Sequence, residues 1–225
     1  MRALVSAVGL SISLFASQCQ ATVPASFTIR NSKPLKDASI QIVSFGAVAG
    51  LDKIAIKKIN TALRAAATSF GKEAKECGTY AEGHPWEYKL TLEKVRHSEK
   101  YLSVVFSKWT VCAGSPDIEK EARVFSLPNG DLIPARALFK QILPNAKLVI
   151  GASHNKELIR LDEEMTETLI NDSKEVLKIY DGQCEFFLKN TSYRIWMEGK
   201  NLILFPEFTQ PESICQKEYL IQPDE

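Results

Sequence analysis

The chain has 225 residues, of which 45% are hydrophobic, and it carries 28 Lys or Arg against 27 Asp or Glu, a formal net charge of +1. This balance disfavours nucleic-acid binding, which usually requires a basic excess, and no basic amphipathic stretch predicts a membrane-surface helix. The length is sufficient for the core of one large domain or two small ones, and we expect a single domain over residues 22–225.

The first 21 residues predict a cleavable secretory signal. Arg2 provides a positive start, an apolar run extends from Ala3 to Phe15, and small or polar residues lead to Ala21, after which we expect cleavage. The run is shorter than the ~20 apolar residues needed to cross a bilayer, so we expect no stable membrane insertion. Cys19 leaves a lipid anchor as the alternative, although Gln18 is not a typical residue before a lipidated cysteine. We therefore expect a periplasmic or secreted protein.

Four cysteines follow the signal, an even number that suggests two disulfides in an exported protein. Of the three possible pairings we favour Cys77–Cys112 and Cys184–Cys215, because each closes a loop of moderate length within one half of the chain. We expect no metal and no cofactor, because the sequence contains neither a CxxC pair nor a nearby histidine doublet.

The N-terminal half is expected to contain strands and one long helix. Apolar residues at three- and four-residue spacing predict a helix over Leu51–Phe70, with Gly71 as its stop. Period-two alternation predicts a long hairpin around Tyr88–Leu92 and Leu102–Val111. The other expected strands are Phe27–Arg30, Ala38–Phe45 and Glu121–Leu127, the last followed by a turn at Pro128–Asp131.

The C-terminal half is expected to contain two helices followed by strands. A short helix over Ala135–Leu143 precedes a second long helix over Leu158–Tyr180, whose apolar residues follow one stripe. The expected strands after it are Cys184–Leu188, Ser192–Met197, Asn201–Phe205 and Gln216–Ile221. The order strand, helix, strands, helix, strands predicts an α+β fold, in which two long helices pack on one antiparallel sheet.

One segment resembles a known family. Residues Glu121–Phe139 read EARVFSLPNGDLIPARALF. This resembles a segment of the exported domains that include the lysozyme-sensing domain of RsiV-type anti-sigma factors and the non-catalytic module of PdaC-type peptidoglycan deacetylases. Ile59-Asn60 fits an Ile-Asn pair on the family's first helix, and Tyr193–Pro206 fits its C-terminal strand–turn–strand. Where many members have His-Pro after the long second strand, this chain has Ser115-Pro116.

The resemblance implies a non-catalytic binding module. Its partner would be a lysozyme-like cell-wall hydrolase, which the protein would inhibit or against which it would give immunity. The alternative is a module of the cell envelope that binds peptidoglycan glycan directly.

The binding surface is expected where two loops meet. Residues 80–86 include Gly83 and Pro85 and predict a loop tip, which the Cys77–Cys112 disulfide would bring beside the loop at 113–117. Rigid loops lose little entropy on docking, so they suit protein binding. The residues expected to contact the partner are His84, Trp86, Ser115, Pro116 and Asp117.

An enzyme is the least favoured interpretation. Ser153 and His154 are adjacent, which is a poor arrangement for a nucleophile and its base. Acidic residues at Glu163 and Glu167 would share a helix face opposite the apolar stripe, which predicts a solvated surface and not the enclosed carboxylate pair of a glycosidase. Trp109 and Trp196 are expected in the core. We therefore expect no catalytic residue and no enzymatic activity.

Overall fold

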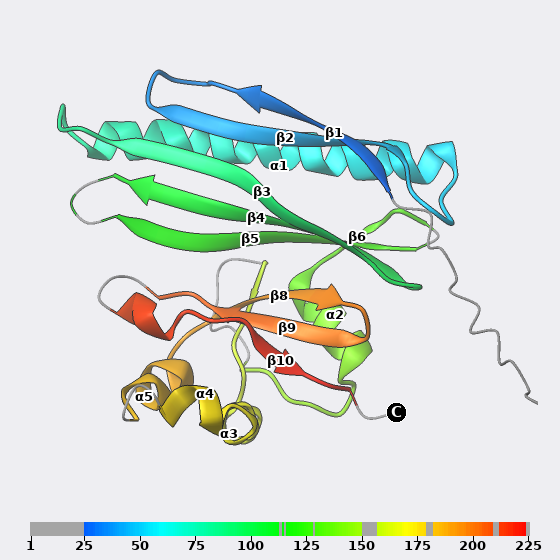
Figure 1. Cartoon of the computed structure of the whole chain (residues 1–225), viewed down its shortest axis with the longest axis vertical. Helices are drawn as coiled ribbons and strands as arrows, with labels where there is room; N and C mark the ends of the chain where they lie inside the picture. Colours follow the sequence, from blue (N-terminus) through cyan, green and yellow to red (C-terminus); the bar gives the residue numbers. More distant parts are fainter. Residues whose placement is uncertain are drawn as a thin grey trace, which may run out of the picture.

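The computed structural model describes residues 25–112, 114, 116–127, 129–149, 157–178, 182–208 and 212–223. The expected signal over residues 1–21 and the candidate residue Ser115 lie outside these ranges, as do Ser153 and His154. The described part of the chain forms two β-sheets with helices outside them (Figure 1).

The first sheet has six strands in the order β1-β2-β3-β4-β5-β6. They are β1 (Ser26–Ser32), β2 (Ala38–Ala47), β3 (Glu87–His97), β4 (Tyr101–Val111), β5 (Asp117–Ser126) and β6 (Leu132–Ile133). The pair β2–β3 is parallel, with Ala38 opposite Tyr88, whereas the other neighbours are antiparallel. Parallel neighbours need a crossover connection, which the helix α1 (Lys53–Tyr80) provides here.

Helix α1 packs its apolar stripe on this sheet. Asp52 caps its N-terminus by accepting a hydrogen bond from the Ala55 backbone N–H at 2.7 Å. The helix does not stop at Gly71, as expected from the sequence, but continues to Tyr80. Ala74 and Cys77 extend the buried stripe past the glycine, so burial outweighs the ~1 kcal/mol helix penalty of one glycine.

The pairing of β2 with β3 ends at Ile40. Beyond it, two polar side chains form hydrogen bonds with backbone groups of these strands. Asn60 of α1 donates a hydrogen bond to the Phe45 carbonyl and accepts one from the Phe45 N–H, both at 2.8 Å. Gln41 accepts one from the Leu92 N–H, also at 2.8 Å. Ile59 beside Asn60 is fully buried. In the Ile-Asn pair noted in the sequence, Ile59 therefore anchors α1 in the core, and Asn60 forms the hydrogen bonds that the β2 backbone would otherwise lack.

The second sheet has four strands in the order β10-β9-β8-β7. They are β7 (Leu158–Ile159), β8 (Tyr193–Glu198), β9 (Asn201–Pro206) and β10 (Tyr219–Ile221). One core cluster joins this sheet to the face of the first sheet that carries Val105, Ala122 and Val124. The remaining helices belong to the same half of the molecule (Figure 1): α2 (Ala135–Ile142), α3 (Glu163–Asp172), α4 (Lys174–Leu177), α5 (Gln183–Lys189) and the 3₁₀ helix η2 (Glu212–Cys215).

The expected fold, with two long helices on one antiparallel sheet, is wrong. There are two sheets, the first contains a parallel pair, and α1 is the one long helix among the described residues. The expected helix over Leu158–Tyr180 divides into β7, α3 and α4, and its last two residues lie outside the described ranges. Leu158 pairs with Arg194 in the second sheet, and Asp162 starts a new helix by accepting a hydrogen bond from the Met165 N–H at 3.0 Å. Strand pairing and this cap outweigh the helical periodicity.

The expected strand over Cys184–Leu188 is also wrong, because these residues form α5. Cys184 and Leu188 are four residues apart and both buried, whereas Phe186 between them is 68% exposed. This short segment has apolar residues on both faces, so its sequence does not distinguish a helix from a strand.

The cysteines are joined as Cys77–Cys112 and Cys184–Cys215, the pairing favoured from the sequence. The first disulfide links the last turn of α1 to the end of β4, and the second links α5 to η2. Disulfides are typical of proteins outside the reducing cytosol. None of the described helices is long and apolar enough to cross a membrane.

Candidate functional site

A hollow of about 420 Å³ lies at the end of the first sheet, where α1 ends and β3 begins. Two of the residues expected to bind a partner, His84 and Trp86, line it. The other lining residues are Lys36, Asp37, Gly78, Gly83 and Pro85. His84 is exposed to solvent, whereas Trp86 is half-buried.

Trp86 is fixed by direct contact with the α1 backbone. A Cβ atom added at Gly78 would lie 2.7 Å from Cζ2 and 2.9 Å from Cε2 of the Trp86 indole. A real Cβ does not approach that closely, so the contact requires glycine at this position. The indole also packs against the core beneath α1. Trp86 therefore has one defined position beside the hollow.

The loop that carries His84 is held by its own backbone. The Ala81 N–H donates to the Cys77 carbonyl at 3.1 Å, and the His84 N–H donates to the Ala81 carbonyl at 2.8 Å. Glu82 and Gly83 both have positive φ, +49° and +89°, which turns the chain sharply after α1. Ala81 is buried, so the loop is anchored at its base and presents His84 at its tip.

The second expected loop lies at the same end of the first sheet, but it does not line the hollow. The strand register places Glu87 opposite Val111 and Asp117 opposite Thr110, so both loops leave the sheet at this end. Pro116 is exposed and Asp117 is half-buried. Burial raises the pKa of the Asp117 carboxyl, and the nearby charge of Glu119 raises it further. The structure thus brings His84 and Trp86 together and leaves Pro116 and Asp117 at the same end of the sheet, outside the hollow.

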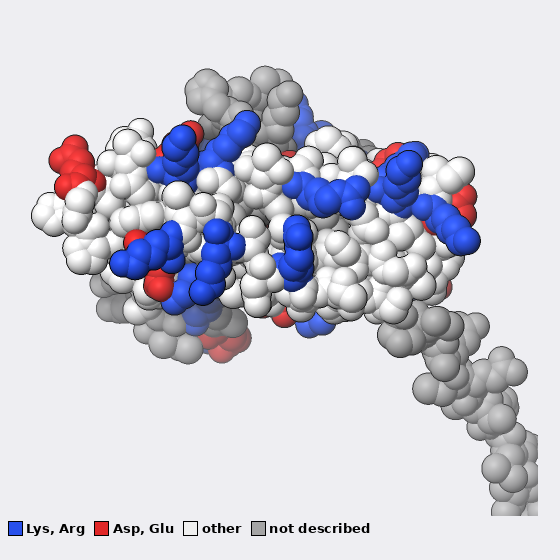
Figure 2. All heavy atoms as spheres, turned by 90° about the horizontal axis from the view of Figure 1, so that it is seen from above, with Lys and Arg blue, Asp and Glu red and all other residues white. Residues whose placement is uncertain are grey.

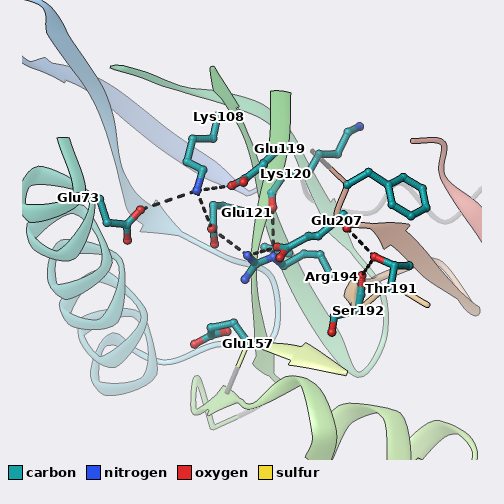
Figure 3. A network of polar contacts seen from close by, with 12 residues as sticks. Glu73, Lys108, Glu119, Lys120, Glu121, Glu157, Thr191, Ser192, Arg194 and Glu207 are labelled. Atoms are coloured by element: carbon teal, nitrogen blue, oxygen red, sulfur yellow. Dashed lines mark hydrogen bonds and ion pairs between the residues drawn. The ribbon is translucent and has the colours of Figure 1, made fainter. Parts of the chain in front are cut away.

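A buried network of charged groups joins α1, β4 and β5 to β8 of the second sheet (Figure 3). Arg194 of β8 is at its centre and is only 2% exposed. Its Nε donates to the Lys120 carbonyl of β5 at 3.1 Å. Its Nη2 donates to Glu121 Oε1 at 2.9 Å and to Glu207 Oε1 at 2.6 Å. Arg194 therefore attaches the second sheet to a backbone group and a side chain of β5.

The network continues to α1 through Lys108. The Lys108 ammonium ion-pairs with Glu119 and lies 3.8 Å from carboxylate oxygens of both Glu121 and Glu73. On the other side, Arg123 donates to Glu121 Oε2 at 3.2 Å. Cations and carboxylates thus alternate from α1 through β4 and β5 to β8 (Figure 3).

The pKa shifts agree with a structural role for this network. Burial alone would lower the pKa values of Lys108 and Arg194, but the adjacent carboxylates outweigh it and raise both. Burial raises the pKa values of Glu73 and Glu207, and their cationic partners oppose that rise. Each charge is held in place by an opposite one, which favours a clamp between layers over a catalytic acid–base pair. Sequence reasoning missed this network, because isolated charges in strands give no sign of their partners.

Trp196 lies in the core, as expected from the sequence, beneath a second group of ion pairs. The Lys94 and Lys120 ammonium groups lie 5.2 Å and 5.8 Å from the centroid of its ring. Both ammonium groups also ion-pair with Glu218, at 2.7 Å and 2.5 Å. Trp109 is half-buried, and its Nε1 has no hydrogen-bond partner among the described residues.

No protein-family model matches the chain, and no curated protein matches its sequence. The resemblance drawn from Glu121–Phe139 therefore stays a prediction. Among the described residues, no group of three or more His, Cys, Asp or Glu side chains is placed to hold a metal ion.

Proposed function

We propose that this protein is an exported, non-catalytic binding protein that blocks a lysozyme-like cell-wall hydrolase, either as an inhibitor or as an immunity protein. It acts in the periplasm or outside the cell after removal of residues 1–21. The RsiV- and PdaC-type resemblance and the secretory character of the N-terminus support this proposal. The two disulfides are compatible with an oxidising compartment.

The observation that carries the proposal is the preorganised loop end. Trp86 is held against Gly78, and the Cys77–Cys112 disulfide fixes the end of α1 from which the loop departs. Tryptophan is enriched among the residues that dominate binding energy at protein interfaces. A loop that is already ordered loses little conformational entropy when it enters an active-site cleft.

The test is a turbidity assay of cell-wall lysis by lysozyme, with purified protein of residues 22–225. We expect a dose-dependent block that saturates near one inhibitor per enzyme. His84→Ala should weaken the block at least about tenfold, and Trp86→Ala more, because truncation of an interface anchor typically costs about 2 kcal/mol or more. Phe186→Ala is the matched control, because this side chain is 68% exposed on α5, which lies on the opposite side of the two sheets from α1 (Figure 1).

Loss of inhibition in the Phe186→Ala variant, or full inhibition by the His84→Ala variant, would contradict the role of the loop. His84 is exposed, so its truncation tests binding without disturbing the core. If the wild-type protein blocks no member of a panel of lysozyme-like hydrolases, the proposal itself fails.

The hollow favours a second candidate, a module that binds peptidoglycan glycan. Its volume of about 420 Å³ lies within the range of small-ligand sites, and it combines an indole with polar groups of Asp37 and His84. A glycan-binding module should co-sediment with insoluble peptidoglycan in the absence of any hydrolase, and Trp86→Ala should abolish that binding. An inhibitor should remain in the supernatant until its hydrolase is added.

A further inference from the structure

The outer face of α1 carries a row of five basic side chains, here called the α1 stripe. At 100° per residue these positions fall within a sector of about 100°, on the side of the helix away from the core. All five are exposed, and at 1.5 Å per residue the row extends about 33 Å along the helix. The stripe consists of Lys53, Lys57, Arg64, Lys72 and Lys75.

The stripe differs from many other cations of the molecule in forming no ion pair. None of its five side chains forms an ion pair within the described part of the chain, whereas Lys58, on the flank of the same helix, pairs with Asp131 at 2.7 Å. The acidic residues of α1, Glu73 and Glu76, lie outside the sector. Glu76 borders the sector beside Lys72, but the residues within the sector between the cations are uncharged, so the stripe carries a net positive charge.

The basic character continues beyond the helix. Figure 2 views the molecule from the side of β1, β2 and α1, and Lys and Arg side chains are spread along the middle of this face, with the visible acidic side chains mostly near its ends and edges. Arg30, Lys33 and Lys36 on and after β1 are exposed. Exposed apolar side chains accompany these cations: Ile54 at the start of α1 is 69% exposed, and Phe27 and Ile29 of β1 are 38% and 47% exposed.

We infer that the α1 stripe docks the protein on an anionic phospholipid surface. The stripe is long and lies along one helix side, so several cations can meet a flat layer of phosphate groups at once. Membrane-surface proteins combine such cations with apolar side chains that enter the headgroup region, as Ile54 would do here. An anionic glycan strand is the less favoured partner, because the α1 stripe contains no aromatic platform on which sugar rings could stack.

This docking is peripheral and independent of the proposed inhibition. The apolar stripe of α1 faces the first sheet, so the helix stays in the fold and its cationic side meets the lipid. The loop that carries His84 and Trp86 follows the C-terminus of α1. A membrane-bound molecule can therefore still present that loop.

The test is co-sedimentation of the protein (residues 22–225) with vesicles of phosphatidylglycerol and phosphatidylcholine in equal parts, compared with phosphatidylcholine alone. We expect binding to the anionic vesicles only, and loss of binding when salt rises from about 0.1 M to about 1 M, because the screening length falls from about 10 Å to about 3 Å. The triple variant Lys57→Gln, Arg64→Gln, Lys72→Gln should bind about 100-fold more weakly, since each cation near an anionic leaflet contributes about fivefold. The matched control is Lys174→Gln, Lys178→Gln, Lys189→Gln, which removes three exposed cations from α4, its C-cap and α5 and should bind like wild type.

Equal vesicle binding by the stripe variant and wild type would overturn the inference. So would binding to heparin, used as a soluble polyanion, without binding to anionic vesicles, because that result identifies a glycan as the partner. The stripe variant should still block lysozyme in the turbidity assay, so failure of the proposed inhibition and failure of membrane docking give separate results.

Discussion

The buried cations that join the layers and the cations of the α1 stripe have opposite surroundings. Arg194, Lys108 and Lys120 are buried or nearly so, and each meets at least two carboxylates. Lys57 and Arg64 on the stripe are exposed and meet none within the described residues. The same residue types therefore serve two purposes: the buried cations hold the layers together, and the exposed ones are free to meet a partner.

This difference predicts how the two groups respond to mutation. A buried charge that loses its partner stays in a low-dielectric site without compensation, which is costly. An exposed charge without a partner is solvated by water in both the folded and the unfolded chain, so its removal barely affects folding. Stability measurements and binding measurements should therefore separate the two groups.

Arg194→Met should have the largest effect on stability. It removes the donor that serves the Lys120 carbonyl, Glu121 and Glu207, and leaves these buried acceptors without it. We expect a loss of about 3–5 kcal/mol in the free energy of unfolding, measured by urea denaturation. A loss below about 1 kcal/mol would show that the network does not hold the sheets together.

Removal of the disulfide at the end of α1, by Cys77→Ser with Cys112→Ser, should cost about 2–4 kcal/mol. The bridge joins residues 35 positions apart, so its loss frees a long loop in the unfolded chain. The same change should weaken the block of lysozyme, because it loosens the base of the loop with Trp86. Cys184→Ser with Cys215→Ser is the matched control: it should cost similar stability but leave inhibition of the folded protein unchanged.

The ion pairs around Trp196 should make folding sensitive to acid. Burial alone would raise the pKa of Glu218, but hydrogen bonds from Lys120 and Lys94 outweigh it and lower the pKa below its ordinary value. Its contribution to stability is therefore complete above the ordinary carboxyl pKa of about 4.3 and is lost as pH falls through the lower folded-state value. We expect Glu218→Gln to reduce the stability difference between about pH 6 and about pH 3 by at most about 1 kcal/mol, since this carboxylate is partly exposed and solvent screens its ion pairs.

Glu207→Gln should change the acid sensitivity of folding in the opposite direction. Burial raises the pKa of Glu207 above its ordinary value despite Arg194, so the folded protein takes up this proton more readily than the unfolded chain as pH falls. Substitution of Glu207 should steepen the loss of stability in acid rather than reduce it. The measurement is the urea midpoint at about pH 6 and about pH 3. If Glu218→Gln and Glu207→Gln changed the difference between these two midpoints in the same direction, this assignment would be contradicted.

The smallest effect on stability is expected at the α1 stripe. Lys57→Gln with Arg64→Gln and Lys72→Gln should change the free energy of unfolding by less than about 0.5 kcal/mol, as is usual for exposed positions without partners. A thermal melt measured by circular dichroism checks this value. A larger loss would mean that the stripe serves the fold, and the contrast with the buried cations would disappear.

The sequence alone determined the features that depend on local pattern. The strands around Ile29, Ile42, Val104 and Leu204 were predicted within a few residues of their observed bounds, whereas the strand around Leu90 continues five residues past its expected end at Leu92. Cysteine number and spacing favoured the observed pairing. The first long helix was predicted, but its end was not, because burial of Ala74 and Cys77 carries it past Gly71.

Only the tertiary structure decided the features that depend on distant partners. Leu158 pairs with a strand thirty-six positions later, so its segment is a strand and not the start of a helix. Trp86 is fixed by Gly78, and Glu121 meets Arg194 from the other sheet. The charges of the chain balance almost completely, yet the fold sorts them into a paired interior and an unpaired outer stripe. The periodicity of apolar residues in the sequence indicates which residues are buried. The partner of each charge depends on how the layers pack, which this periodicity does not indicate.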